Sequence, residues 1–447
     1  MSDSQDAAKS KEGSKDEQSS WQDNCHGVSA LAIKRLIKFA HCKDKTLLIY
    51  GGLKTMLVAD CSTGSLMELE QSHTERVTSV TVGKDKEVMV SGGNDKRLVV
   101  WQLPEMKVAS KTVTDKKVVS VVLDEERRRV VFAEIAGEVF QKPIDDLDSK
   151  AEHLLGHISS LTDMRISPSG SRLLTSDRDE KVRISNFPHA FEIEAFCLGH
   201  TELVTCIETF TLAEEELLLS GGADGSVRLW SVKDGSLLDT YMIDPAGEEE
   251  EGEDGQQADS QPLAEEPKTW DRFAAGTAQA TAAVSGRMRR RTNSPAVVAL
   301  AYCPRLSLAA CIIENQREVL LLQVSGKELK ELNRVEVDQM PVGIEIDDVE
   351  HEGKAECFML VAVLDDRPKL EAFRVEGGKE CVVKKIDLKS SKEESKIISA
   401  FACLSEEMST RQEESHKASG QDGSGQYFQK RRRHTEPGFK QYQGKAD

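Results

Sequence analysis

Three sets of histidine, hydroxyl and aspartate side chains recur along the chain, and each set has the residue types of a catalytic triad. In such a triad, histidine takes a proton from a serine or threonine nucleophile while aspartate orients the imidazole ring. The sets are His73, Ser91 and Asp95; His157, Thr175 and Asp179; and His200, Ser220 and Asp224. In every set the hydroxyl residue stands four positions before the aspartate. One active site needs only one triad, whereas a repeat protein contains the same structural contacts in each repeat. We therefore predict a structural role for all three sets.

The rest of the sequence offers no spacing that supports catalysis. Gly51-Gly52 and Gly92-Gly93 lack the G-x-G-x-x-G pattern of a phosphate-binding loop, and we interpret them as turn glycines. Ten cysteines are scattered without a C-x-x-C pair, and His26, Cys42 and His189 show no metal-ligand spacing. We therefore predict no catalytic residue, no cofactor and no metal site. Scattered single cysteines are also typical of a reducing, intracellular compartment.

Short runs of β-branched and apolar residues must position the three sets. Turn residues separate these runs at intervals of roughly 8–12 residues, which indicates an all-β fold. The runs are Leu47–Tyr50, Val88–Val90, Leu98–Trp101, Val118–Val122, Val130–Phe132, Leu217–Leu219, Val227–Trp230, Val297–Tyr302, Val319–Leu322 and Phe358–Val363. The three histidines lie 84 and then 43 residues apart, multiples of the period of about 42 that is typical of a four-stranded blade. The sequence predicts a single WD-repeat β-propeller, with seven blades once the degenerate repeats are counted.

A tryptophan completes the buried, hydrogen-bonded tetrad of a WD repeat. Trp101 and Trp230 complete the first and third sets, whereas Ser185 stands at the matching position of the second. We therefore expect the second network to be truncated and less stabilised, by about 1 kcal/mol for the missing hydrogen bond.

The composition is acidic, with a formal net charge of −18, so the chain as a whole repels a phosphate backbone. Three segments, 1–22, 246–294 and 404–447, have too few apolar residues to offset the entropy of ordering, and we predict that they are disordered. They leave a propeller in two parts, residues 23–245 and 295–403. No stretch approaches the ~20 apolar residues of a membrane span, so we expect a soluble protein without a membrane partner.

The turn after Ser176 is unusually charged. Residues 176–183 read SDRDEKVR, whereas the third repeat reads GADGSVR at the corresponding turn. Arg178, Glu180 and Lys181 thus replace small residues. Because a tight turn gains nothing from this exchange, the segment is either a docking surface or an ordinary solvated hairpin.

Three segments resemble the WD-repeat accessory subunit of the tRNA (guanine-N(7)-)-methyltransferase family: LLGH at 154–157, TSDRDEKVRIS at 175–185 and EIEAFCLGHTELV at 192–204. The resemblance is strong over about residues 150–235 and is limited to architecture elsewhere. It implies a heterodimer with a Rossmann-fold catalytic subunit that binds S-adenosylmethionine and methylates a guanine of the tRNA variable loop. The accessory chain would stabilise that partner and help to position tRNA, without being an enzyme itself.

Carried over residue by residue, the resemblance puts Arg178, Glu180, Lys181 and Arg183 at the interface with the catalytic subunit. Lys181 and Arg183 would pair with carboxylates of the partner. Arg183 is the weaker candidate, because Arg228 occupies the matching place of an ordinary blade and can pack there by its stem alone. A generic scaffold remains the alternative function, for example a ubiquitin-ligase substrate adaptor or a chromatin-associated protein, since it would share every feature of the propeller.

A basic run near the C-terminus consists of Lys430, Arg431, Arg432 and Arg433. Such a run is typical of a nuclear import signal, of a phosphate contact with tRNA, or of an end that only makes the chain more soluble. We favour import, and we expect a nuclear protein, with a cytoplasmic pool left open.

Overall fold

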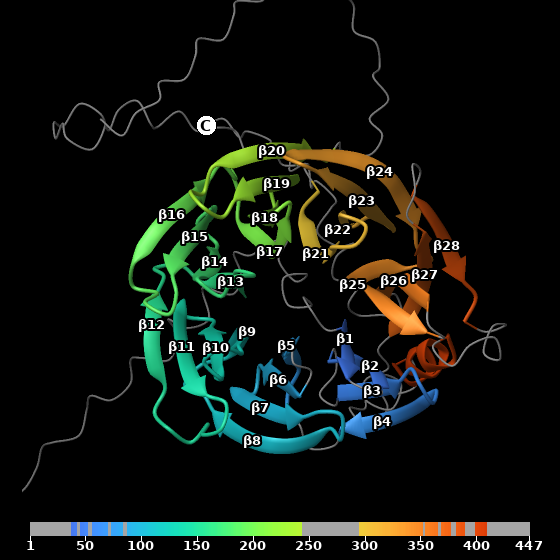
Figure 1. The fold of residues 1–447 in the computed structure, drawn as a ribbon, viewed down its shortest axis with the longest axis horizontal. Helices are drawn as coiled ribbons and strands as arrows, with labels where there is room; N and C mark the ends of the chain where they lie inside the picture. Colours follow the sequence, from blue (N-terminus) through green and yellow to red (C-terminus); the bar gives the residue numbers. More distant parts are fainter. Residues whose placement is uncertain are drawn as a thin grey trace, which may run out of the picture.

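Strands dominate the computed structural model, which describes residues 37–42, 45–51, 56–69, 73–83, 87–243, 295–351, 354–364, 368–376, 381–388 and 398–408. Over these residues the strands form seven antiparallel sheets of four, and each sheet uses four consecutive strands. Figure 1 shows the sheets around a ring, with the first strand of each sheet nearest the centre and the fourth at the rim. The predictions of an all-β fold and of seven blades are confirmed.

The strands of the first four blades, in order from centre to rim, are β1 (Ile37–Cys42), β2 (Lys45–Tyr50), β3 (Met56–Asp60) and β4 (Ser65–Leu69); β5 (Val77–Val82), β6 (Val88–Gly93), β7 (Arg97–Gln102) and β8 (Lys107–Val113); β9 (Val118–Asp124), β10 (Arg129–Glu134), β11 (Glu138–Pro143) and β12 (Glu152–Gly156); and β13 (Leu161–Ile166), β14 (Arg172–Asp177), β15 (Lys181–Asn186) and β16 (Ile193–Leu198). Those of the last three blades are β17 (Val204–Leu212), β18 (Glu215–Gly222), β19 (Ser226–Ser231) and β20 (Leu237–Met242); β21 (Val297–Cys303), β22 (Leu308–Ile313), β23 (Glu318–Ser325) and β24 (Glu328–Glu336); and β25 (Met340–His351), β26 (Lys354–Leu364), β27 (Pro368–Glu376) and β28 (Val382–Ile386).

The residue pattern of a strand matches its distance from the centre of the ring. Every residue of β22, LAACII, is buried, because the middle strands of a blade pack against the neighbouring blades on both faces. The rim strand β8, KVASKTV, has no buried residue. A strand buried on both faces reads as a continuous apolar run, and a strand that faces water carries polar residues.

Gly92 and Gly93 lie at the end of β6 and not in a turn, so their interpretation as turn glycines is wrong. A Cβ atom on Gly92 would lie 2.6 Å from Cγ1 of Val118 in the next blade, whereas a Cβ atom on Gly93 would lie 2.8 Å from Nδ1 of His73 and 2.8 Å from Oδ1 of Asp95. The first glycine therefore permits close packing between blades, and the second leaves room for the His73–Asp95 contact.

A helix over residues 398–408 packs where the first and last blades meet, as Figure 1 shows beside β28. The ring of Phe401 lies edge-on to Phe39 of β1 and to Phe358 of β26, with centroids 6.2 Å and 5.5 Å apart. Leu404 and Met408, on the same helix, are fully buried in this cluster. The helix thus covers the apolar seam between the two blades.

This helix corrects one predicted boundary. It continues five residues into the segment 404–447, which we expected to be a disordered tail. These residues are ordered because their apolar side chains are buried between the first and last blades. Residues 1–22, 246–294 and the basic run from Lys430 to Arg433 lie outside the described residues. Within the described part of the chain, no helix combines the length and apolar character that a membrane crossing requires.

Candidate functional site

The first histidine set is enclosed by its own blade. His73 Nδ1 lies 2.9 Å from Asp95 Oδ1, and His73 Nε2 lies 2.9 Å from Ser91 Oγ. Trp101 donates its Nε1–H to the same Ser91 oxygen at 3.0 Å. Ser91 has no exposed surface, so its hydroxyl is out of reach of any substrate. The arrangement is a structural network and not a nucleophile with its base.

The third set repeats this geometry. His200 lies 3.0 Å from Asp224 Oδ2 and 2.7 Å from Ser220 Oγ, to which Trp230 donates at 2.8 Å. Burial raises the pKa of Asp224, but hydrogen bonds from His200 and Ser226 outweigh it and lower this pKa to about 2. Asp224 is therefore an anion whose charge is neutralised by hydrogen bonds within the blade.

The second set differs from the prediction. His157 Nδ1 lies 2.8 Å from Oδ2 of Asp177, while His157 Nε2 lies 2.8 Å from Thr175 Oγ1. Asp177 is 1% exposed, whereas the side chain of Asp179 is 52% exposed. The assignment of Asp179 to the tetrad is therefore wrong, and Asp177 is the acid of this network.

The residue before the turn explains why Asp177 takes the place of Asp179 in this network. Gly93 and Gly222 hold that position in the other two blades, and a side chain on either glycine would collide with the histidine–aspartate pair. Asp177 occupies the same position in the blade β13–β16, so its own carboxylate takes the place beside the histidine. Asp179 is thereby displaced to the surface, and its backbone N–H donates to Asp177 Oδ1 at 2.9 Å.

Arg183 belongs to the interior of the blade and not to its surface. It is 8% exposed, and its guanidinium donates to Ser185 Oγ at 2.9 Å, to the carbonyl of Ala190 at 2.9 Å and to that of Gly156 at 3.3 Å. The small Ser185 at the tryptophan position accepts one of these bonds. Because the donors of Arg183 are directed at acceptors inside the blade, its prediction as a partner-binding residue is wrong.

The other three predicted interface residues lie at the turn between β14 and β15, which we call the charged hairpin (residues 178–181). Arg178 and Glu180 are exposed, and Glu180 has a φ of +67°. Lys181 is partly exposed; its Nζ lies 3.1 Å from Asp177 Oδ2 and 3.5 Å from Asp179 Oδ2. Burial raises the pKa of Asp177, but hydrogen bonds from His157 and Lys181 outweigh it and hold this pKa below the ordinary value. Lys181 therefore has a role inside the blade, where it stabilises the anion of Asp177.

An apolar stripe borders the charged hairpin on the rim strand β16. Leu198 is the backbone partner of Lys181, and Phe196 is the partner of Arg183. Leu198 is 67% exposed and Phe196 is 39% exposed, although both are large and apolar. Phe191, just before β16, is 70% exposed. A charged tip beside exposed apolar side chains has the composition of a protein-binding surface, which combines an apolar centre with a polar rim.

Sequence reasoning missed Asp177 and the apolar stripe. The signal for Asp177 was the replacement of the glycine pair by Ser176 and Asp177, which removes the room that the turn aspartate needs. The signal for the stripe was the run EIEAFCL at 192–198, in which Phe196 occupies a rim position that carries Lys111 in β8 and Thr240 in β20.

Comparisons with known proteins agree with this architecture. Residues 133–380 match the family described as the tRNA methyltransferase TRM82 WD40 domain, and residues 64–102 match the WD domain, G-beta repeat. The tRNA (guanine-N(7)-)-methyltransferase non-catalytic subunit wdr4 of Dictyostelium discoideum is 32% identical over 221 residues, which cover 45% of this chain and 47% of that protein. The subunit WDR4 of Homo sapiens is 29% identical over 199 residues, covering 44% of this chain and 48% of that protein.

The matched part of this chain therefore spans about half the length of these relatives. Among solved structures, a chain of the mitotic checkpoint complex superposes with a TM-score of 0.56 at 12% identity, covering 76% of this chain and 89% of that one. At this identity the likeness concerns the fold alone.

Proposed function

Because this chain belongs to the tRNA methyltransferase TRM82 WD40 domain family, we propose that it is the non-catalytic subunit of a tRNA (guanine-N(7)-)-methyltransferase. Its partner is a catalytic subunit of Rossmann fold that binds S-adenosylmethionine, and the two form a heterodimer. The names of the relatives support this role.

One observation carries the proposal: the charged hairpin and the apolar stripe form a continuous surface within the part of the chain that matches the family. Exposed Leu198 and Phe196 supply the apolar contact, and Arg178 and Glu180 supply charges at its edge. We propose that the catalytic subunit docks here, so that its active conformation is stabilised by the rigid blade.

The contribution of this chain to tRNA binding is indirect. Its net charge of −18 opposes a phosphate backbone, so the catalytic subunit provides most of the cationic surface. The propeller helps to position tRNA by holding that surface in place. The heterodimer should therefore bind tRNA much more tightly than this chain alone, which a comparison of their dissociation constants at one salt concentration would test.

The apolar stripe can be tested with Leu198→Asp. A carboxylate placed in an apolar contact loses its hydration on binding, and the expected cost of about 2 kcal/mol or more corresponds to a dissociation constant raised about 30-fold for the catalytic subunit. Val113→Asp is the matched control, because Val113 is 69% exposed, ends the rim strand β8 and pairs with the first residue of β7 just as Leu198 pairs with the first residue of β15. Equal affinity of both variants for the catalytic subunit would refute docking on the stripe.

The charged hairpin can be tested with Arg178→Glu, which should slow association and weaken the complex through like-charge repulsion. The control is Lys96→Glu, a charge reversal at the tip of the equivalent hairpin of the blade β5–β8. Lys181→Glu is a poor probe, because it would place a carboxylate beside the buried carboxylate of Asp177 and disturb the fold itself. If Arg178→Glu and Lys96→Glu associate at the wild-type rate, the hairpin is only a solvated turn.

The methyltransferase subunit proposed here and a generic scaffold predict different binding partners. Affinity purification from native cells should recover a Rossmann-fold methyltransferase with this chain, and the reconstituted pair should methylate tRNA while this chain alone does not. Recovery of ubiquitin-ligase or chromatin components without a methyltransferase would contradict the proposal and favour the scaffold.

We further propose that the protein acts in the nucleus and that the run from Lys430 to Arg433 serves as its import signal. Deleting residues 429–447 should move the protein toward the cytoplasm, as measured by fractionation or fluorescence microscopy. An unchanged nuclear fraction would exclude this role, whereas weaker tRNA binding by the heterodimer would assign the run to a phosphate contact.

A further inference from the structure

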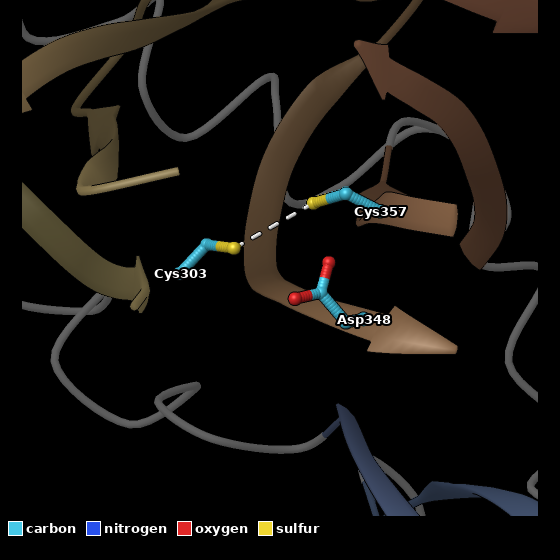
Figure 2. A group of neighbouring side chains, drawn as sticks. All are labelled: Cys303, Asp348 and Cys357. Atoms are coloured by element: carbon cyan, nitrogen blue, oxygen red, sulfur yellow. Dashed lines mark hydrogen bonds between the residues drawn. The ribbon is translucent and has the colours of Figure 1, made fainter. Parts of the chain in front are cut away.

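Three potential metal ligands converge between the last two blades. Cys303 ends β21, while Asp348 of β25 and Cys357 of β26 are direct partners in the antiparallel ladder. Figure 2 shows the three side chains pointing toward one another from these strands. Their ligand atoms all lie within 4.8 Å of one another, and the two cysteines are buried.

The distance between the two sulfurs suits a shared metal ion. Cys303 Sγ and Cys357 Sγ are 3.7 Å apart. Two Zn–S bonds of about 2.3 Å at a tetrahedral angle put the sulfurs about 3.8 Å apart, so a zinc ion fits between them without movement of the strands. A disulfide of about 2.05 Å would require the blades to approach or the side chains to rotate.

The two carboxylate oxygens of Asp348 have different surroundings. Its Oδ2 accepts a hydrogen bond from Arg305 Nε at 2.8 Å. Its Oδ1 is shielded from solvent and accepts no hydrogen bond from any residue that the structure describes. Ligating carboxylates are commonly held by such a second partner, which leaves the remaining oxygen for the metal.

The charges of this cluster also balance when a zinc ion is bound. Two thiolates and one carboxylate carry three negative charges, and a zinc ion together with Arg305 supplies three positive ones, as buried charges require.

We propose that Cys303, Asp348 and Cys357 form a zinc site that joins the blade β21–β24 to the blade β25–β28, with water as the fourth ligand. On binding, Cys303 and Cys357 each release a proton, Asp348 Oδ1 donates a lone pair, and the zinc ion undergoes no redox change. We predicted no metal site from the sequence, because the two cysteines are 54 residues apart and no short spacing between ligands indicates the site.

The test uses the full chain, purified under phosphine reductant and loaded with zinc sulfate. We expect one zinc ion per chain by elemental analysis, about two protons released per ion at neutral pH, and a higher Tm with zinc than after chelation. Loading with Co²⁺ instead should give a thiolate-to-metal charge-transfer band, which reports sulfur ligands directly.

Two variants and a control identify the ligands. Cys303→Ser should abolish the charge-transfer band or shift it, and Asp348→Asn should weaken zinc binding by at least the about 10–100-fold that second-shell changes cost. Asp348→Asn keeps the Arg305 hydrogen bond at a partly exposed position, so it tests the site even where Cys303→Ser fails to fold. Cys311→Ser, which removes a buried cysteine of the blade β21–β24, should leave zinc binding unchanged.

Three outcomes would overturn the proposal. They are the absence of stoichiometric zinc, binding that is equal in wild type and in both ligand variants, and a Cys303–Cys357 disulfide in protein purified without reductant. The last outcome would make the pair a redox site.

Discussion

The exchange of Asp177 for Asp179 in the second histidine network predicts a specific pattern of stabilities. Asp177→Ala removes the bonds to His157 and to the Asp179 N–H, and it leaves His157 Nδ1 buried without its acceptor. The expected loss is about 2–4 kcal/mol, because a charged hydrogen bond is lost and a buried donor is stranded. Asp179→Ala removes only an exposed carboxylate with a surface ion pair to Lys181, for which we expect about 0.5 kcal/mol or less.

Asp177→Gly extends this prediction. Glycine restores the room that the other two blades provide, so Asp179 can turn inward and bind His157 as their turn aspartates bind their histidines. Asp177→Gly should therefore be about 1–2 kcal/mol milder than Asp177→Ala, even after the entropic cost of a glycine. In the Asp177→Gly background, Asp179→Ala should become destabilising by about 2 kcal/mol, although it is nearly neutral in the wild type.

Thermal and urea unfolding of the wild type and the four variants, followed by circular dichroism, measures these differences. Asp177→Ala should lower Tm by about 4 °C or more, whereas Asp179→Ala should leave it within about 2 °C. The reasoning fails if Asp179→Ala costs the same in both backgrounds, because Asp179 then never enters the network. It also fails if Asp179→Ala is the more damaging single change.

Three further changes test other parts of the structure. Trp230→Phe removes the 2.8 Å bond to Ser220 Oγ and should destabilise the chain by about 1 kcal/mol in urea unfolding. Arg183→Met strands carbonyls inside the blade and should cost about 2 kcal/mol or more, while the folded variant should bind the catalytic subunit as wild type does. Burial raises the pKa of Glu345 from 4.5 to about 7 against the opposing effect of Lys38, so folding favours the protonated form. The contribution of Glu345 to the free energy of unfolding is then complete below the pKa of the unfolded chain and is lost as pH rises through about 7. Glutamine does not titrate, so the difference in urea midpoint between Glu345→Gln and wild type should rise between about pH 5 and pH 8.

Local sequence was sufficient for much of the fold. The spacing of His73, His157 and His200 and the alternation of apolar runs with turns predicted a seven-bladed propeller, because each blade is built from one contiguous stretch of chain and its hydrogen-bonded frame lies within one period. The charged hairpin was also visible, since Arg178, Glu180 and Lys181 replace the small residues of the equivalent turn in the third repeat.

Tertiary structure decided which side chains are available for binding. Arg183 and Lys181 are both cations of the same segment, yet the first is directed into the blade by Ser185 and two carbonyls, and the second is held by Asp177. Residue type and spacing cannot distinguish a solvated charge from an internally bonded one, because that difference depends on acceptors from other strands.

Short-range sequence patterns were sufficient to predict the repeat, the blade and the family resemblance. Three features became visible only in the folded chain: Asp177 displaces Asp179, a helix over residues 398–408 covers the seam between the first and last blades, and Cys303 meets Cys357 across two blades. Each of these features depends on the space beside a residue that is distant in sequence. Close packing between strands sets that space, and residue spacing along the chain does not encode it.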